Sequence, residues 1–533
     1  MQKDVQLRLA PHKAADDKAI RKALGISATT PFFILKKSID ARRKDVMVDL
    51  VCRVNPDQAL FQATELKYVN SALGQVIVVG SGPAGLFAAL TLLEQGVKPI
   101  VLERGKDVHS RRKDIAKIST CGKVDSQSNY SFGEGGAGAF SDGKLFTRSK
   151  KRGENSKVLN LFVQYGANSS ILYEAHPHIG TDKLPKIVEN MRNAIISHGG
   201  EVHFETQVVD LLVDSGRCVG CTAKNLVSGE LTSYVGPVIL AVGNAARDTF
   251  EMLLSHKIEL SAKDLAMGVR LEHPQHLIDC IQYHNPQGRG EFLPAAEYSF
   301  TTQVPVSEVD FSGSVGKDSV GVYSFCMCPG GFVVPAASDS QQVVVNGMSP
   351  SNRGSKWANS GMVVEFSTSL LGNAEFVKKN PLCMMKMQQE LEKAMFVAAS
   401  GTQKAPAQRM VDFINNRLST SLPASSYAPG LTNANMREVL PPYATSALAY
   451  AFQTFGRYAP GFETNEAILI GSETRTSSPI RIERNPDTLE SISMENFYPC
   501  GEGAGYAGGI VSAAVDGIRC AQMILAKKVV KIS

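Results

Sequence analysis

The sequence lacks any long hydrophobic run. In its 533 residues no apolar stretch approaches the roughly 18 residues that a membrane-spanning helix needs, and residues 1–13 contain no apolar segment of a signal peptide. We therefore expect a cytoplasmic protein without a membrane span. Tryptophan occurs once and aromatic residues make up 7% of the chain, but 43% of the residues are hydrophobic. This fraction is enough for large buried cores and excludes disorder as a description of the whole chain.

The charge shows no general excess of one sign. The net charge of +5 falls within residues 1–70, which hold 13 basic and 8 acidic residues. Because the remaining chain is close to neutral, a nucleic acid or a membrane surface is disfavoured as a general partner. The basic N-terminal stretch is instead a candidate docking surface for a partner protein.

The cysteines lack the spacing of a disulfide framework or a zinc site. Ten of them are scattered along the chain, which is typical of a reduced cytosolic protein. Around neither close pair, Cys218/Cys221 or Cys326/Cys328, does a second Cys/His pair follow at ligand spacing, so we expect no metal. The first pair lies in a strand–turn pattern and is interpreted as structural. The second either faces a bound ring or ends a buried strand.

The strongest pattern in the chain is a strand, a glycine-rich turn and a helix. Residues 76–79 are β-branched and predict a buried strand, which runs directly into the GSGPAG turn at 80–85. A helix is predicted over residues 83–95. A second apolar strand, 99–102, ends in Glu103, about 20 residues past the glycines, as the dinucleotide-binding fingerprint requires. We therefore predict dinucleotide binding rather than a glycine-rich turn without a ligand.

Each residue type in this turn has a physical reason. Gly80 allows the tight turn, Gly82 lets a pyrophosphate approach the backbone, and Gly85 lets the helix pack closely against the sheet. The helix N-terminus offers free N–H groups to the phosphates, and Glu103 can accept hydrogen bonds from ribose hydroxyls. The residues predicted to hold this end of the cofactor are Gly80, Ser81, Gly82, Pro83, Ala84, Gly85, Glu103 and Arg104. Arg111 is a weaker candidate for the pyrophosphate, the alternative being a solvated basic face.

Three later segments favour FAD over NAD. The segment from Gly501-Glu502 to Gly509-Ile510-Val511 resembles the returning strand–turn–helix of flavoproteins with two dinucleotide-binding domains. In that resemblance, Glu502 binds the ribityl chain and the next helix points its N-terminus at the flavin pyrimidine. Val208 would meet the adenine, and Ala241 and Gly243 resemble the strand-end motif of the same proteins. No second glycine-rich strand–turn–helix follows, so NAD(P)H would bind only transiently. No CxxxxC or CxxC follows the first helix, which disfavours a disulfide reductase.

A glycine-dense segment, residues 132–145, contains too many glycines for an ordinary helix or strand. It suits backbone that lies close to a flat ring and to phosphates, and we favour this over a flexible surface loop. Gly136 and Gly138 are therefore predicted cofactor contacts, and Lys144 is a candidate for charge stabilisation near the flavin.

With these residues the chain resembles a bacterial family of uncharacterised FAD-dependent dehydrogenases or oxidoreductases. The matching pieces span almost everything after residue 72, and they are the motifs at 80–85, 132–145, 266–274, 323–331, 471–479 and 500–509. The resemblance implies bound FAD and a redox role, but no particular substrate. More distantly, the layout is similar to flavoproteins that reduce carbon–carbon double bonds and to flavin-dependent tRNA-modifying enzymes.

We therefore expect an α/β protein with the glutathione-reductase-like, two-dinucleotide-binding-domain (Rossmann-like) FAD fold. A small N-terminal α+β domain (1–70) precedes the first part of the FAD-binding domain (71–263). An α+β substrate or cap domain (264–460) is inserted before the C-terminal part (461–533). The catalytic residues are not identified by the sequence, and the inserted domain offers only single candidates. These are Arg270, Glu272 and His273 as a polar cluster, Arg475 as an anion ligand or a loop brace, and Tyr506 as a proton donor or a packed aromatic.

Three functions remain open. The first is a FAD-dependent oxidoreductase that exchanges hydride or electrons through flavin N5 with a small-molecule substrate, with NAD(P)H, a quinone or a partner protein as the electron donor. The second is a flavin-dependent RNA-modifying enzyme that grips RNA through the basic N-terminus, although only one local basic run, 42–44, stands out and no aromatic residues interleave with it. The third is an FAD-binding electron-transfer or scaffold protein.

Overall fold

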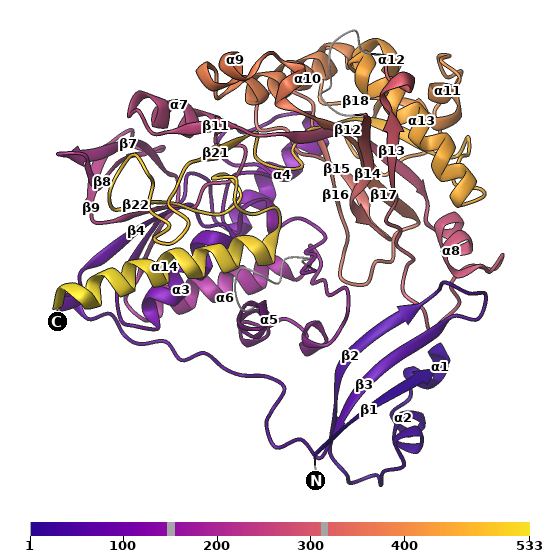
Figure 1. The fold of residues 1–533 in the computed structure, drawn as a ribbon, viewed down its shortest axis with the longest axis horizontal. Coiled ribbons are helices and arrows are strands. Elements are labelled where there is room, and N and C mark those ends of the chain that lie inside the picture. The colour runs from indigo at the N-terminus through magenta and orange to yellow at the C-terminus, as the bar shows by residue number, and fades with distance from the viewer. Residues whose placement is uncertain (1, 147–154, 311–317, 533) are drawn as a thin grey trace.

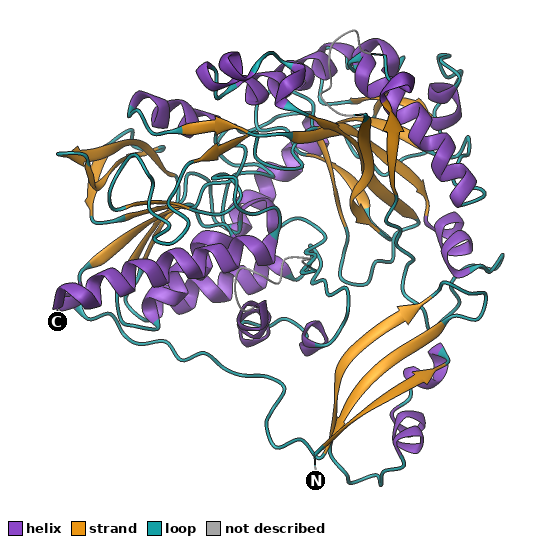
Figure 2. Ribbon diagram, viewed as in Figure 1, coloured by secondary structure: helices purple, strands orange, loops and turns teal. Residues whose placement is uncertain are grey.

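The computed structural model describes residues 2–146, 155–310 and 318–532. In it the chain forms an N-terminal unit, a parallel-sheet domain and an inserted domain (Figure 1). The inserted domain is formed by the chain between two strands of the parallel sheet, β10 and β22. The elements are drawn by type in Figure 2.

The parallel-sheet domain is built on five parallel strands in the order β22-β10-β4-β5-β6. Both faces of this sheet are covered, so its strands are apolar throughout. On β4, Val76 and Val78 pack into a core with helices α3, α6 and α14, while Ile77 and Val79 pack against a three-stranded antiparallel sheet. The five strands are β22 (Phe497–Pro499), β10 (Val238–Leu240), β4 (Gln75–Val79), β5 (Lys98–Leu102) and β6 (Glu201–His203).

The elements around this sheet come from both ends of the chain. Helix α14, close to the C-terminus, packs directly on α3, which follows the first strand (Figure 2). The helices are α3 (Pro83–Leu93), α4 (Val108–Cys121), α5 (Asn155–Gln164), α6 (Leu184–Ser197), α7 (Arg247–Ser255) and α14 (Ile510–Ile532). The covering strands are β7 (Thr206–Asp214), β8 (Arg217–Asn225) and β9 (Leu231–Val235), and a two-stranded ribbon joins β11 (Leu260–Ala262) to β21 (Ile480–Ile482).

The inserted domain is a seven-stranded sheet covered by helices. Its order is β13-β14-β17-β12-β20-β18-β19, antiparallel except for the last pair. The strands are β13 (Thr301–Pro305), β14 (Ser319–Cys328), β17 (Trp357–Phe366), β12 (Leu265–Pro274), β20 (Ile468–Glu473), β18 (Ala405–Arg409) and β19 (Leu431–Asn433), with a separate ribbon of β15 (Phe332–Pro335) and β16 (Val345–Met348). The helices are α8 (Gln275–Tyr283), α9 (Ala374–Lys379), α10 (Cys383–Ala398), α11 (Met410–Ile414), α12 (Met436–Val439) and α13 (Pro442–Tyr458).

One boundary of this domain lies later than the sequence indicates. Strand β20 follows residue 460, yet it pairs with β12 and β18 near the middle of the seven-stranded sheet. The sheet therefore holds the chain in the inserted domain through Glu473, and the first strand outside it is β21. An apolar strand alone does not say which sheet it joins, because both sheets bury it equally well.

The N-terminal unit is a three-stranded antiparallel sheet in the order β1-β3-β2, with two helices on one face. Strand β3 alternates between buried and half-buried residues, as a sheet with one covered face requires. Asp16 caps α2 through the backbone N–H of Lys18, and Gly25 ends it in the left-handed conformation. The elements are β1 (Lys3–Leu9), α1 (Pro11–Ala14), α2 (Asp17–Leu24), β2 (Phe32–Asp40) and β3 (Met47–Val54).

Short 3-10 helices complete the described elements: η1 (Ser71–Leu73), η2 (Gly136–Gly138), η3 (Ser169–Leu172), η4 (Val306–Glu308) and η5 (Thr368–Leu370). Among the helices of the described residues, none has both the length and the apolar character needed to cross a bilayer.

Candidate functional site

A cavity of about 390 Å³ lies where the parallel-sheet domain meets the inserted domain. This volume is in the range of small-molecule and cofactor sites. The glycine turn after β4, the glycine-dense segment and the start of α14 line one part of it. The inserted domain contributes Phe325 and Cys326 from β14 and Glu473 from β20. Segments more than 400 positions apart in the sequence therefore share one cavity.

The three glycines of the turn have different surroundings. A Cβ on Gly80 would lie 2.6 Å from the carbonyl oxygen of Ala241, and one on Gly85 would lie 1.9 Å from that of Gly80. These two glycines are required by backbone packing. A Cβ on Gly82 would have Gly136 as its nearest neighbour, at 3.9 Å, so Gly82 leaves open space at the N-terminus of α3. This is the space that a pyrophosphate needs.

Glu103 is placed at the end of β5 and lines the cavity. Its carboxylate accepts four hydrogen bonds, from the backbone N–H and the hydroxyl of Ser81 and from the backbone N–H groups of Gly105 and Gly133. The acid therefore ties the glycine turn to the glycine-dense segment. The contact of Glu103 with a ribose stays a prediction. Both of its carboxylate oxygens already accept hydrogen bonds from the protein, so a ribose hydroxyl would donate to an oxygen that has other donors.

Arg111 does not face the cavity, and this corrects the sequence-based prediction. The side chain is fully buried, and its guanidinium donates to the backbone carbonyls of Asn129, Tyr130, Gly133 and Glu134. A buried guanidinium needs such partners. Arg111 therefore supports the glycine-dense segment from behind and binds no pyrophosphate, and neither is it part of a solvated face.

Lys144 ends the glycine-dense segment beside the cavity. Its Nζ is buried and has no hydrogen-bond partner among the described residues. Burial alone would lower the pKa of Lys144, but Cys326, Cys328 and Asp142 outweigh it and raise this pKa above its ordinary value. Asp142 in turn forms a buried ion pair with Arg353, at 2.9 Å. Lys144 is therefore a charged donor available to a group in the cavity.

Glu502 and Glu473 are the two carboxyl groups of the cavity with raised pKa values. Burial raises the pKa of Glu502 to about 7, although Lys263 acts in the opposite direction. Burial also raises the pKa of Glu473 to about 7, in spite of its ion pair with Arg270 at 3.0 Å. Both groups can therefore hold or release a proton near neutral pH. Sequence reasoning identified Glu502 but missed Glu473, whose only signal was its place beside Arg475.

Arg475 braces the cavity wall. Its Nε donates to Glu392 at 3.1 Å and its Nη1 to the hydroxyl of Ser131 at 3.3 Å, while Arg247 donates to the same Glu392 through two bonds, at 2.9 and 3.0 Å. Burial would raise the pKa of Glu392, but Arg475 and Arg247 outweigh it and lower this pKa to about 2. The geometry thus supports the bracing interpretation of Arg475, since it joins α10 of the inserted domain to the loop at Ser131, while Arg247 ties α7 to the same Glu392.

The remaining single candidates do not gather at the cavity. Glu272 accepts from the backbone N–H of Ser426, and His273 donates to the carbonyl of Phe462, so they do not form one cluster with Arg270. Tyr506 donates its hydroxyl to the carbonyl of Ile482 at 3.0 Å, which supports the packed-aromatic interpretation.

Most of the predicted cofactor residues line the cavity. These are Gly80, Gly82, Pro83, Ala84, Glu103, Arg104, Gly136, Gly138, Lys144, Val208, Ala241, Gly243, Glu502, Gly509 and Ile510. Those that lie outside its lining are Ser81, Gly85, Arg111, Gly501 and Val511. Lining residues that the sequence did not identify include Thr206, Asn244, Phe325, Asn346 and Gly347. A Cβ on Gly243 or Gly509 would meet no atom within 4 Å. The open glycine surfaces and the unpaired Nζ of Lys144 together fit an anionic dinucleotide that carries a flat ring.

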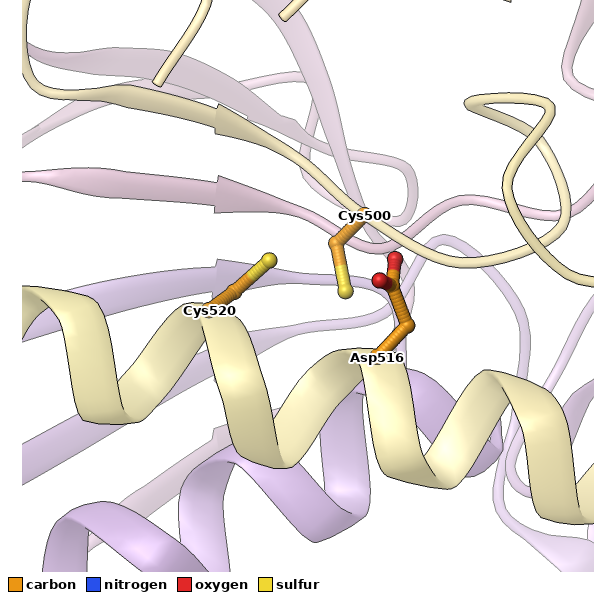
Figure 3. Close-up of side chains that lie close together, drawn as sticks. All are labelled: Cys500, Asp516 and Cys520. Carbon is orange, nitrogen blue, oxygen red and sulfur yellow. The ribbon is translucent and has the colours of Figure 1, made fainter. Parts of the chain in front are cut away.

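One buried trio has the ligand types of a metal site, away from this cavity. Cys500, Asp516 and Cys520 lie close together between the end of β22 and helix α14 (Figure 3). Both carboxylate oxygens of Asp516 are already used, because Arg484 donates to them at 2.7 and 3.0 Å and the backbone N–H of Gly501 adds a third bond. A cation would have to displace a buried guanidinium, so this trio offers no vacant acceptor to a metal.

Comparisons with known proteins agree on the cofactor. Family models described as FAD binding domains match residues 74–120 and 138–276, a model described as FAD-dependent protein, C-terminal domain-like, matches 264–476, and a domain of unknown function matches 1–55. An uncharacterised protein of Clostridium beijerinckii is 42% identical over 516 residues, covering 93% of this chain and 92% of that protein. The predicted FAD cofactor and α/β cofactor fold are confirmed by these matches.

Solved structures show weaker likenesses. A variant of the E. coli quinol fumarate reductase FrdA is 12% identical, covering 86% of this chain and 70% of that one, with a TM-score of 0.36. A flavoprotein/dehydrogenase from Cytophaga hutchinsonii is 13% identical, covering 86% of this chain and 79% of that one, with a TM-score of 0.35.

Proposed function

As a member of a family of uncharacterised FAD-dependent oxidoreductases, this chain binds FAD, and we propose that it exchanges hydride or electrons with a small molecule held in the same cavity. The observation that carries the proposal is the shared lining of that cavity. Open glycine backbone lies on the side of the parallel-sheet domain, and Phe325, Cys326 and Glu473 lie on the side of the inserted domain. When bound, FAD supplies two-electron redox chemistry through its ring.

The protein's own contribution is binding, orientation and proton handling. The N-terminus of α3 and the open space at Gly82 would receive the pyrophosphate, and α14 begins at Ile510 with its positive end toward the cavity. Lys144 offers a fixed positive charge. Glu473 and Glu502 hold protons near neutral pH and are the candidate acids for a substrate that gains a proton as it is reduced.

The proposal leaves the electron donor and the substrate to be identified by experiment. The test is anaerobic reduction of the purified flavoprotein with NADH and, separately, with NADPH, followed by a screen of unsaturated and hydroxylated metabolites for reoxidation. We expect a yellow protein with about one FAD per chain that one nicotinamide reduces and that at least one metabolite reoxidises faster than buffer does. A protein purified without flavin, or a reduced flavin that no screened metabolite reoxidises, would contradict the proposal.

The RNA-modifying alternative has less support in the structure. In the N-terminal unit, Arg8 and Arg42 both pair with Asp40, and Arg53 pairs with Asp4. Internal pairing leaves fewer of these positive charges for phosphates. We keep the N-terminal unit as a proposed docking surface for a protein, and tRNA binding that weakens steeply with salt would reverse this preference.

A further inference from the structure

Two cysteines of the inserted domain lie at the cavity. Cys326 lines the cavity, and Cys328 is fully buried at the end of β14. Met327 between them packs into the hydrophobic core of the inserted domain. Cys326 therefore faces the cavity, and Cys328 lies behind it in the protein interior.

The backbone at this point departs from a regular strand. Cys326 has a φ of 45°, and the pairing of β14 with β17 shifts between Phe325 and Cys328, which is a β-bulge. In a flat strand, residues two apart have Cα atoms about 6.6 Å apart, close to the upper limit for a disulfide. Here the Cys328 thiol donates to the carbonyl oxygen of Cys326 at 3.3 Å, so it turns back toward the preceding cysteine.

Two cations surround the pair. Nη2 of Arg270 donates to the carbonyl of Cys326 at 2.7 Å and to Sγ of Cys328 at 3.3 Å. The unpartnered Nζ of Lys144 acts on the same two thiols. The hydrogen bond from Cys328 lowers the pKa of Cys326, burial opposes this, and Lys144 and Arg270 lower it further. The lowered pKa favours the thiolate of Cys326, which is the form that reacts in disulfide chemistry.

We propose that Cys326 and Cys328 form a redox-active dithiol that exchanges two electrons with the FAD, closing to a disulfide when the flavin is reduced. One S–S bond forms as the two thiols lose two protons and two electrons, and the flavin takes up both electrons and protons to become FADH₂. The reverse step opens the disulfide and reoxidises the flavin. The inference rests on the proposed function for its cofactor, and it adds to the site a second two-electron store within the protein itself.

The test counts electrons. The flavin-loaded protein is oxidised with diamide, freed of reagent, and reduced anaerobically with dithionite while the flavin absorbance is followed. We expect four electrons per flavin for the native protein, and two for Cys326→Ser and for Cys328→Ser. Cys520→Ser is the matched control, because it removes a thiol from another pair of neighbouring buried cysteines, Cys500 and Cys520. It should still take up four.

Differential alkylation and peptide mapping identify the bond. After diamide, the peptide that holds both Cys326 and Cys328 should carry a disulfide, and after dithionite two alkylated thiols. A native protein that takes up two electrons per flavin, with both thiols alkylated after diamide, would overturn the dithiol and leave the proposed function intact. A protein that binds no flavin would overturn both the proposed function and the electron exchange between the dithiol and FAD. Peptide mapping would then still show whether Cys326 and Cys328 form a disulfide.

Discussion

The carboxylate of Glu502 accepts a hydrogen bond of 2.8 Å from the side-chain amide of Asn244, a residue 258 positions earlier in the chain. Asn244 follows β10 and Glu502 follows β22, and these two strands are parallel neighbours. Both residues line the cavity. The bond therefore fixes the orientation of Glu502 where the two strands end, as expected for a binding site at the carboxyl ends of a parallel sheet.

Glu502→Gln should change how the flavin potential depends on pH. Burial raises the pKa of Glu502 to about 7, so the group is neutral below that pH and negative above it. A negative charge beside the flavin disfavours the uptake of electrons by its ring. The native midpoint potential should therefore fall more steeply than that of the variant as pH rises through 7. Spectroscopic redox titrations between pH 6 and 8.5 measure this, and parallel curves for the two proteins would contradict it.

Gly82→Val should separate cofactor binding from folding. Gly82 has a φ of −73°, which any residue can adopt, and the nearest atom to an added Cβ is 3.9 Å away. We expect the variant to fold with a melting temperature close to that of the native apoprotein but to retain less than a tenth of the flavin.

Gly85→Ala provides the contrast. Its added Cβ would lie 1.9 Å from the carbonyl oxygen of Gly80, so the backbone itself must shift. We expect a lower melting temperature in the apoprotein. If Gly82→Val keeps its full flavin content, the pyrophosphate is not at this turn.

Lys144→Met should make Cys326 less reactive. The ammonium group is one of the charges that lower the pKa of Cys326, so its removal raises that pKa and reduces the thiolate fraction at neutral pH. The rate of iodoacetamide modification at Cys326, mapped by peptide mass, should fall several-fold at pH 7 and recover at higher pH. Lys224→Met, at an exposed position on β8, is the control and should leave the rate unchanged. Equal rates in all three proteins would show that Lys144 does not act on the thiol.

Glu392→Gln should destabilise the protein, because it leaves Arg247 and Arg475 without their buried partner. Breaking a buried ion pair from one side costs about 3–5 kcal/mol, which urea denaturation of the apoprotein measures. Glu375→Gln, in an exposed pair with Lys379, is the matched control and should change stability by less than about 1 kcal/mol.

The same residue predicts the behaviour in acid. The pKa of Glu392 is about 2 in the folded protein and about 4.3 when unfolded. The unfolded state therefore binds more protons between these values, and the stability that Glu392 contributes is present above pH 4.3 and lost as pH falls toward 2. The difference between native protein and Glu392→Gln should shrink over this range, and a constant difference would contradict the assignment.

The cofactor end of the site could be predicted from the sequence because its parts are local. The turn at residues 80–85 and the acid at 103 lie within one strand–helix–strand unit, where spacing alone fixes which backbone groups meet. The glycine-dense segment at 132–145 was likewise recognisable, since few other structures need so many glycines. The role of Arg111 was not, because a basic residue on an amphipathic helix has the same pattern whether it faces phosphate, water or backbone carbonyls.

Local chemistry along the chain thus determined the FAD fold, and it predicts where the pyrophosphate should bind. The meeting of Cys326, Lys144 and Glu473 in one cavity was decided only by the tertiary structure, since they come from β14, the glycine-dense segment and β20. The end of the inserted domain, expected at residue 460, lies after Glu473 for the same reason. Strand pairing in the seven-stranded sheet decides that β20 belongs to this domain. Spacing governs contacts within one supersecondary unit, but contacts between distant segments depend on how buried surfaces and charges pair, and a single sequence does not contain that pairing explicitly.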